Sequence, residues 1–345
     1  MEPETRRATG PGRVNLIGDH TDYNQGLALP MAIGLGVTVR FTPMPGPRIV
    51  VMSTAFGPAI ELPAELSADA AAVAAIEPPW ARLIAAMIAV APPRAGGTLH
   101  IDATLPIGSG LASSAALSVA LAEVFGVLGS PEDMARLCQR AEHLSGVPVG
   151  TMDPLICAGG RRGHALLIDF STLATRQVPI PEQAEIVVVD SGQRRTLRTS
   201  EYATRVAECD AAARLLGPLG QADQGELVGL ADPVLRRRAR HVISECRRVR
   251  RCAEALMAGD LAGAGALMTE SHQSLTADFA VSTPVLDALV DDLLSRPGVF
   301  GARMTGAGFG GCVVALCRPG AIDLRALPTP AWRVDPTDGT VASRV

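Results

Sequence analysis

A short polar turn near the start of the chain holds three side chains that could bind a substrate rich in hydroxyl groups. Asp19, His20 and Asp22 lie within four residues of one another in the segment RVNLIGDHTDYNQG, residues 13–26. Carboxylates accept hydrogen bonds, and an imidazole can both donate and accept them, so the turn suits a polyol. The alternative is a solvated turn without function. A metal site is less favoured, because the spacing suggests no third ligand.

A glycine-rich loop at residues 106–114 (PIGSGLASS) leads into an apolar helix. A loop of this kind points free backbone N–H groups and the positive end of the helix dipole at an anion. Gly108 and Gly110 would let the backbone approach a triphosphate closely. The hydroxyl groups of Ser113 and Ser114 could bind phosphate or Mg²⁺. Taken alone, the loop is explained equally well as a strand-to-helix turn capped by serine.

Asp153 lies in an apolar context, VGTMDP, where a carboxylate needs a partner or a function. Considered by itself, it is a candidate helix N-cap with Pro154 at the first helical position. The residues around it therefore leave a structural and a chemical role open.

A second glycine-rich segment, GAGFGG at residues 306–311, formally contains the GxGxxG pattern of dinucleotide-binding proteins. The pattern precedes an expected strand instead of a helix, and too little chain follows for a Rossmann unit. We expect this segment to be a close-approach turn that lines a cleft.

The composition excludes several classes of chemistry. All 31 basic residues are arginine, so the chain has no lysine for a Walker A loop, a protein-kinase strand or a Schiff base. Phosphate chemistry would have to use backbone amides, arginine and a metal ion. The formal net charge of −4 and the lack of an arginine cluster among aromatic residues argue against a nucleic-acid partner.

Other global features indicate an ordinary globular protein. The first nine residues contain no apolar segment, and no run is long enough for a membrane span, so we expect a cytoplasmic protein without membrane contact. The seven cysteines are dispersed and odd in number, which favours buried thiols over disulfides or a zinc site.

The hydrophobic pattern predicts a mixed protein of helices and strands. Strands are expected at residues 13–18, 27–30, 37–41, 98–103, 165–170, 186–190, 301–304 and 312–316. Helices are expected at residues 68–91, 115–128, 131–145, 200–216, 234–258, 261–269 and 283–294, with another beginning near Met152. A domain boundary is plausible near Pro179 and Pro181.

The order of three segments carries a family resemblance. Residues 13–26, 106–114 and 304–311 (MTGAGFGG) resemble the three motifs of the GHMP small-molecule kinases and occur in the same order. The first is similar to the galactokinase signature. Further matches lie between the motifs, at residues 141–143, 150–153, 163–169 and 200–202, so that the resemblance covers roughly residues 10 to 317.

The resemblance implies a fold and a reaction. It implies an α+β, two-domain GHMP kinase fold, with the halves at residues 1–180 and 181–345 and the active site in the cleft between them. The implied reaction transfers a phosphoryl group from ATP to the C1 hydroxyl of a sugar, galactose above all, with Mg²⁺ as cofactor. The expected partners are the sugar and ATP, and the expected assembly is a monomer or a homodimer.

The resemblance also assigns roles to individual positions. Asp153 matches the proposed catalytic base and Arg13 the arginine beside it. Five residues match sugar-contacting positions: Asp19, His20, Asp22, Gly150 and Tyr202. The phosphate loop matches Gly108, Ser109, Gly110, Leu111, Ala112, Ser113 and Ser114. Ser114 and Glu142 match the Mg²⁺ positions.

Two departures from the family pattern bear on the sugar: Asp19 stands where glutamate is usual, and Pro154 where glutamine is common. Ala112 also replaces the first serine usual in the phosphate loop, although Ser113 and Ser114 remain. Two alternatives to a galactose kinase therefore remain. One is a C1 kinase for a modified or longer-chain aldose, and the other is a non-catalytic sugar sensor.

Overall fold

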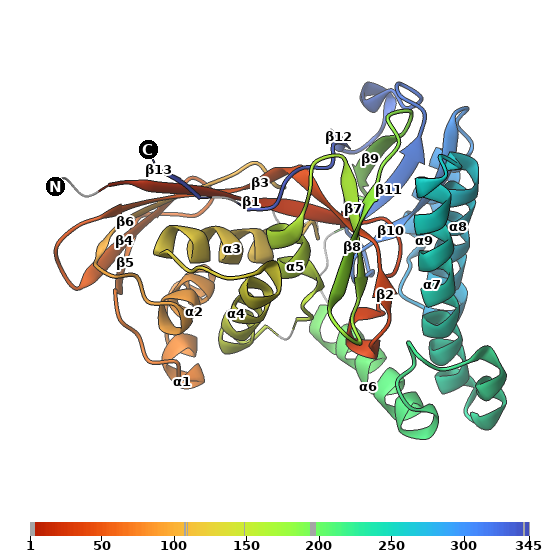
Figure 1. The fold of residues 1–345 in the computed structure, drawn as a ribbon, viewed down its shortest axis with the longest axis horizontal. Helices are drawn as coiled ribbons and strands as arrows, with labels where there is room; N and C mark the ends of the chain where they lie inside the picture. Colours follow the sequence, from red (N-terminus) through yellow and green to blue (C-terminus); the bar gives the residue numbers. More distant parts are fainter. Residues whose placement is uncertain are drawn as a thin grey trace.

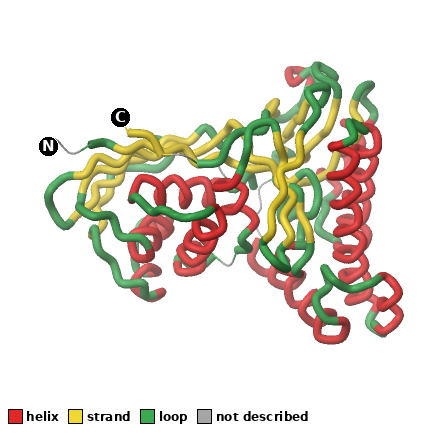
Figure 2. The backbone as a smooth tube through the Cα atoms, viewed as in Figure 1, coloured by secondary structure: helices red, strands yellow, loops and turns green. Residues whose placement is uncertain are grey.

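The computed structural model describes residues 4–106, 108, 110–147, 149–193, 198–340 and 342–344. Within these residues the strands form three sheets, and helices pack against them (Figures 1 and 2). The expected mixture of helices and strands is confirmed. None of the helices in the described ranges has the length and apolar character needed to cross a bilayer.

The largest sheet has six strands in the order β13-β1-β3-β6-β4-β5. Their bounds are β1 Arg6–Asn15, β3 Pro30–Pro43, β4 Arg48–Ser53, β5 Ile60–Pro63, β6 Gly97–Ala103 and β13 Ala342–Arg344. Neighbours pair antiparallel except β4 and β6, which run parallel. The strand β1 ends at Asn15, and three residues separate it from the polar turn that begins at Asp19, so this sheet helps to set the position of the turn.

Helices cover one face of this sheet, as Figure 1 shows. They are α1 Ala70–Ala74, α2 Arg82–Val90, α3 Ser113–Phe125, α4 Pro131–Leu144 and α5 Met152–Gly159. The helix α3 lies so close to β1 that a β-carbon on Gly10 would come within 1.9 Å of the Ala116 carbonyl oxygen. The glycine-rich loop that precedes α3 is thereby held beside the end of β1.

The prediction of a single helix at residues 68–91 is wrong. The structure has two helices there, α1 and α2, separated by a loop and by the 3₁₀ turn Pro79–Ala81. Pro78 and Pro79 explain the break, because proline lacks the amide hydrogen for a helical bond and restricts the residue before it. The helix expected from Ala115 likewise begins two residues earlier, at Ser113.

The C-terminal half is built on a four-stranded antiparallel sheet in the order β10-β11-β9-β12. Its strands are β9 Glu185–Asp190, β10 Val299–Thr305, β11 Cys312–Cys317 and β12 Ala331–Val334. The accompanying helices are α6 Arg198–Leu216, α7 Pro233–Met257, α8 Leu261–Ser274 and α9 Pro284–Leu294. The helices α8 and α9 pack on β10, which carries Arg303 into the interior.

A three-stranded sheet, β2-β7-β8, lies between the two halves (Figure 1). Its strands are β2 Leu27–Ala28, β7 His164–Asp169 and β8 Ala174–Pro179. The division proposed at residue 180 falls between β8 and β9. The chain nevertheless returns to the first sheet at its end, where β13 pairs with β1 and Pro336 bridges to Ile33.

The apolar core is continuous across the two halves. The largest buried cluster contains Leu16 and Ile17 from the first half together with Val249 and Val314 from the second. All seven cysteines are buried, as expected from their spacing, and none is joined in a disulfide. The polar turn that follows Ile17 therefore starts from a rigid, buried backbone.

Candidate active site

Arg13 and Asp153 form a two-pronged ion pair. Arg13 Nε donates to Asp153 Oδ1 at 2.8 Å, and Arg13 Nη2 donates to Asp153 Oδ2 at 2.5 Å. Burial alone would lower the pKa of the Arg13 guanidinium, but the carboxylates of Asp153 and Asp19 raise it above its ordinary value. Arg13 is therefore a permanent cation that compensates the charge of Asp153.

The first turn of α5 presents Asp153. Thr151 occupies the N-cap position, so Asp153 lies inside the helix and the alternative of an N-capping aspartate is wrong. The segment before the helix is tied to α4 at Val149 O, which accepts from Gln139 Nε2 at 3.0 Å and lies 2.9 Å from His143 Nε2. This anchor fixes the position of the carboxylate.

The glycine-rich loop adjoins the same ion pair. Arg13 Nη1 donates to Gly110 O at 2.7 Å, and the Arg13 amide donates to Leu111 O at 3.1 Å. Gly108, Gly110 and Ala112 all have left-handed backbone conformations, with φ of 75°, 80° and 62°. The loop is thus folded tightly against the strand that carries Arg13.

The N-terminus of α3 follows a left-handed residue, Ala112. Ala112 is its N-cap residue and makes no side-chain hydrogen bond, so the alternative of a serine-capped turn is wrong. Ser113 and Ser114 are exposed in the first turn. The amide groups and the positive dipole end of a helix N-terminus, with hydroxyls beside them, suit a phosphate group. Ser109, the other loop residue expected to take part, lies outside the described residues.

The polar turn at residues 19–26 is called the sugar turn below, after the role that the family resemblance implies for it. It meets α6 through its aromatic side chains. His20 Nδ1 lies 3.0 Å from Tyr23 Oη. The ring of Tyr202 in α6 lies 5.9 Å from the His20 ring and 5.8 Å from the Tyr23 ring. Burial, followed by the nearby His241, lowers the pKa of His20 to about 3, so its imidazole is neutral at pH 7 and can both donate and accept.

Asp22 packs directly on Gly150. A β-carbon added to Gly150 would lie 2.0 Å from Asp22 Oδ2, so only glycine leaves room for this carboxylate. Burial, together with the negative charges of Asp153 and Asp19, raises the pKa of Asp22 to about 6. The effect of Asp153 on this pKa places Asp22 in the same neighbourhood as the ion pair.

Asp19 is engaged by the protein on both carboxylate oxygens. Its Oδ1 accepts from the Gly306 amide at 3.0 Å, and its Oδ2 lies 2.6 Å from Arg303 Nη2. Burial raises the pKa of Asp19, although the Arg303 charge opposes that rise. The family resemblance predicts a side chain that faces the sugar. In the structure, its two oxygens face the third motif and β10.

Glu142 and Ser114 supply oxygen ligands of the kind that Mg²⁺ prefers. Glu142 is buried near the C-terminal end of α4. Burial raises the pKa of the Cys157 thiol, and the charges of Asp153, Arg13 and Glu142 also act on that thiol. The carboxylate thus lies near the ion pair, and the donor chemistry of the two residues fits a magnesium ion.

Sequence reasoning missed Arg303 and Glu245, which hold the sugar turn from the C-terminal half. The hydrophobic pattern places Arg303 only in a strand, and Glu245 only in a helix. A usable signal was present for Arg303: it is the one charged residue in the strand VFGARMT, where burial would need a partner. For Glu245 no local signal existed, since charged residues are frequent throughout α7.

The third motif forms a tight loop between β10 and β11. Gly306, Gly308, Gly310 and Gly311 all have positive φ, and a strand follows, so the expected close-approach turn is confirmed. Ser191 and Gln193, at the end of β9, exchange backbone bonds with Gly311. The loop is therefore fixed to the C-terminal sheet.

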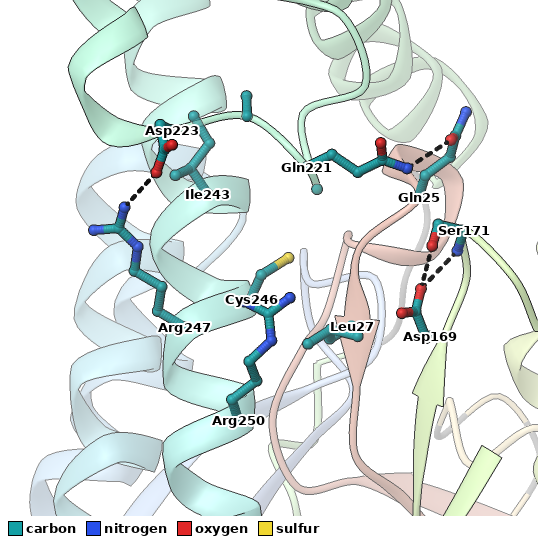
Figure 3. A pocket seen from close by; sticks show the side chains of 12 residues that line it. Gln25, Leu27, Asp169, Ser171, Gln221, Asp223, Ile243, Cys246, Arg247 and Arg250 are labelled. Carbon is teal, nitrogen blue, oxygen red and sulfur yellow. Dashed lines mark hydrogen bonds and ion pairs between the residues drawn. The ribbon is translucent and has the colours of Figure 1, made fainter. Parts of the chain in front are cut away.

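A separate polar cavity of about 310 Å³ lies behind the sugar turn (Figure 3). Residues from the turn, from β7 and from α7 line it, among them Gln25, Asp169, Cys246 and Arg250. Neither the ion pair of Arg13 and Asp153 nor Asp22 contributes to its lining. The cavity is thus distinct from the candidate active site.

Three family models match the sequence. The galactokinase galactose-binding signature matches residues 2–43, the GHMP kinase N-terminal domain matches residues 80–161, and the GHMP kinase C-terminal domain matches residues 252–326. The matched regions include β1 with the sugar turn, the helices that carry the phosphate loop and Asp153, and the third motif.

Known proteins of similar sequence cover nearly the whole chain. The galactokinase of Chloroflexus aggregans is 42% identical, with 93% of this chain and 86% of the relative aligned. The galactokinase of Homo sapiens is 41% identical over 93% of this chain and 85% of its own. The crystal structure of Lactococcus lactis galactokinase complexed with galactose superposes with a TM-score of 0.89 at 28% identity, covering 99% of this chain and 95% of that one.

Proposed function

The chain belongs to the galactokinases of the GHMP kinase family and is an ATP-dependent sugar kinase, and we propose that Asp153 is the general base of its reaction. The substrates are ATP and galactose. The observation that carries the assignment of the base is the two-pronged pairing of Asp153 with Arg13 beside the phosphate loop. Among the described residues, no other carboxylate at the start of α5 pairs with an arginine that also donates to that loop.

In the proposed step, an oxygen of Asp153 takes the proton from the C1 hydroxyl of the sugar. The hydroxyl oxygen forms a bond to the terminal phosphorus of ATP, and the bond from that phosphorus to the bridging oxygen breaks. ADP leaves with the electron pair, and the products are galactose 1-phosphate and ADP. Arg13 keeps Asp153 oriented and offsets the negative charge near the reacting oxygen.

The phosphates of ATP would bind the loop from Gly108 to Ser114. The N-terminus of α3 offers amide donors and a positive dipole end, and Ser113 and Ser114 offer hydroxyls. We assign Mg²⁺ to Ser114 and Glu142, where it would neutralise phosphate charge. The chain meets the need for positive charge with backbone, arginine and metal, since it contains no lysine.

The electrostatics of the sugar turn favour a neutral polyol. Asp19, Asp22 and Asp153 lie near enough to influence one another's environment. Arg13 lies beside Asp153, and Arg303 lies beside Asp19. A substrate with a carboxylate or phosphate at this end would meet repulsion, whereas sugar hydroxyls can donate to these acceptors. We propose Asp22, His20, Tyr202 and the backbone at Gly150 as the sugar-contacting groups.

An aldose panel tests this function. ADP release is measured with galactose, its epimers and longer-chain aldoses, and the phosphorylated carbon is identified by ³¹P–¹H NMR. We expect galactose to be the best substrate and phosphate to appear on C1. A clear preference for a longer aldose would favour the C1 kinase alternative that Asp19 suggests. Light scattering on the same protein tests the proposed monomer or homodimer.

A further inference from the structure

Residues of the C-terminal half anchor the backbone that leads from β1 into the sugar turn. The amide of Asn15 donates to Thr305 Oγ1 at 3.0 Å, and the same hydroxyl donates to Asn15 O at 3.2 Å. The amide of Gly18 donates to Glu245 Oε1 at 2.9 Å. These bonds join segments that are far apart in the sequence, so the position of the turn depends on the C-terminal half.

Arg303 lies at the centre of this anchor and is fully buried. Its Nη2 is 2.6 Å from Asp19 Oδ2 and 4.0 Å from Glu245 Oε1, and its Nη1 donates to Asn15 O at 3.1 Å. Arg248 Nε donates to the other oxygen of Glu245 at 2.7 Å. Two carboxylates and two guanidinium groups therefore compensate one another. Loss of one member would leave an uncompensated buried charge.

The carboxylate of Asp19 has little freedom to serve a substrate as well. Its side chain is 2% exposed. Oδ1 faces the Gly306 amide and Oδ2 faces Arg303, while the backbone oxygen of Asp19 lies 3.3 Å from His241 Nε2. An aspartate side chain has a single methylene, so turning an oxygen towards a sugar would break one of these contacts.

We propose that Asp19 and Arg303 are positioning residues that hold the sugar turn against β10 and the third motif, and that Asp19 makes no hydrogen bond to the sugar. This inference rests on the proposed function, because it assigns roles within the same sugar site. It revises the role that the family resemblance implies for position 19. Discrimination among the sugar hydroxyls then belongs to His20, Asp22 and Tyr202.

The test combines Asp19→Asn with a scan of sugar hydroxyls. The ratio of wild-type to variant kcat/KM is measured for galactose and for its 2-, 3-, 4- and 6-deoxy derivatives. A positioning role predicts a loss of about 10- to 100-fold, because the turn is misplaced. This loss should persist with every deoxy sugar, because a displaced turn disturbs the contacts of both His20 and Asp22 and no single hydroxyl accounts for it. A loss that disappears with one deoxy sugar would mean that Asp19 bonds that hydroxyl, and would overturn the inference.

Asp22→Asn is the matched control, because it removes the same charge from a neighbouring residue that is proposed to touch the sugar. Its loss should vanish for at least one deoxy derivative, which demonstrates that the scan detects a direct contact. Failure of the proposed function would appear in the wild-type protein, as a lack of galactose phosphorylation. Failure of this inference appears only in the variants of an active wild type.

Asp19→Glu keeps the test decisive if Asp19→Asn does not fold. The glutamate retains the charge but lengthens the side chain by one methylene inside the buried ion pair. Positioning predicts a loss that persists with every sugar. An unchanged kcat/KM, or a gain with galactose that one deoxy sugar abolishes, would contradict it.

Discussion

Arg13 and Asp153 lie 140 residues apart in the sequence and meet through two parallel hydrogen bonds, Nε to Oδ1 and Nη2 to Oδ2. The planar guanidinium fixes the plane of the carboxylate as well as its charge. The third donor of Arg13 reaches Gly110 O, so one side chain aligns the proposed base with the phosphate loop. Substitutions at this ion pair and in the two sites that it joins should therefore have distinct kinetic effects.

Replacing Asp153 by asparagine removes the proposed base and keeps the size of the side chain. We expect kcat to fall by roughly 10² to 10⁴-fold, the usual range for a general base. The dissociation constant for ATP, measured by calorimetry, should change little. Asp102→Asn, which breaks the exposed ion pair between Arg40 and Asp102, is the control and should keep wild-type activity. Wild-type turnover of Asp153→Asn would contradict the assignment.

Arg13→Lys keeps the charge but loses the two-pronged geometry. A lysine ammonium cannot bond both oxygens of Asp153 and Gly110 O in the same arrangement. We expect kcat/KM for galactose to fall by about 10- to 100-fold, because a small misplacement of the base is costly. The comparison is with Arg40→Lys, in which an exposed ion pair of β3 and β6 is altered in the same way. Equal activities of the two variants would mean that Arg13 has no role in catalysis.

Gly150→Ala tests the contact between Gly150 and Asp22. The new methyl group would lie 2.0 Å from Asp22 Oδ2, so the carboxylate must move. We expect KM for galactose to rise by about tenfold or more, while KM for ATP stays near its wild-type value. Gly225→Ala is the control, because its new methyl group would meet no atom within 4 Å among the described residues. If only KM for ATP changed, the assignment of Gly150 to the sugar subsite would be wrong.

The pH dependence of kcat/KM for galactose should show the ionisation of Asp22. Burial, with Asp153 and Asp19, raises its pKa from 3.8 to about 6. Above that pH the carboxylate is ionised and accepts bonds from sugar hydroxyls, and below it the proton blocks one acceptor. We therefore expect kcat/KM to rise with pH through about 6, since this parameter reports the free enzyme. The inflection should be absent from Asp22→Asn, and its persistence there would assign it to another group.

The raised pKa of Asp22 also affects the stability of the protein, which should change with pH in the opposite direction to kcat/KM. Because the folded-state pKa of Asp22 is higher than its value in the unfolded chain, the folded protein binds an extra proton between about pH 4 and 6. The contribution of Asp22 to stability therefore falls as pH rises through that window. Asp22→Asn should remove this part of the pH dependence of the melting temperature.

Ser114→Ala tests the nucleotide side of the site. The hydroxyl lies exposed in the first turn of α3, where phosphate and Mg²⁺ are proposed to bind. We expect KM for ATP to rise and the Mg²⁺ concentration needed for half-maximal rate to increase, with KM for galactose unchanged. Ser295→Ala, at the C-terminal end of α9, is the matched control. A rise in KM for the sugar alone would show that the loop is misassigned.

The sequence by itself determined the local features of the site. Glycines at 108 and 110 permit the left-handed turns that bring the phosphate loop to the start of α3, and the absence of lysine restricts how phosphate can be bound. The order of the three motifs identified the family. These properties depend on residue type and on short spacings, which are visible in one dimension.

Only the tertiary structure decided which of these residues meet. The pairing of Arg13 with Asp153, the packing of Asp22 on Gly150 and the engagement of Asp19 by Arg303 all join distant segments. For Asp19, the motif implied a side chain that faces the sugar, and the fold adds two partners for it, the buried guanidinium of Arg303 and the amide of Gly306. A buried carboxylate takes the partners that compensate its lost hydration, and the packing of β10 against the sugar turn determines which partners those are.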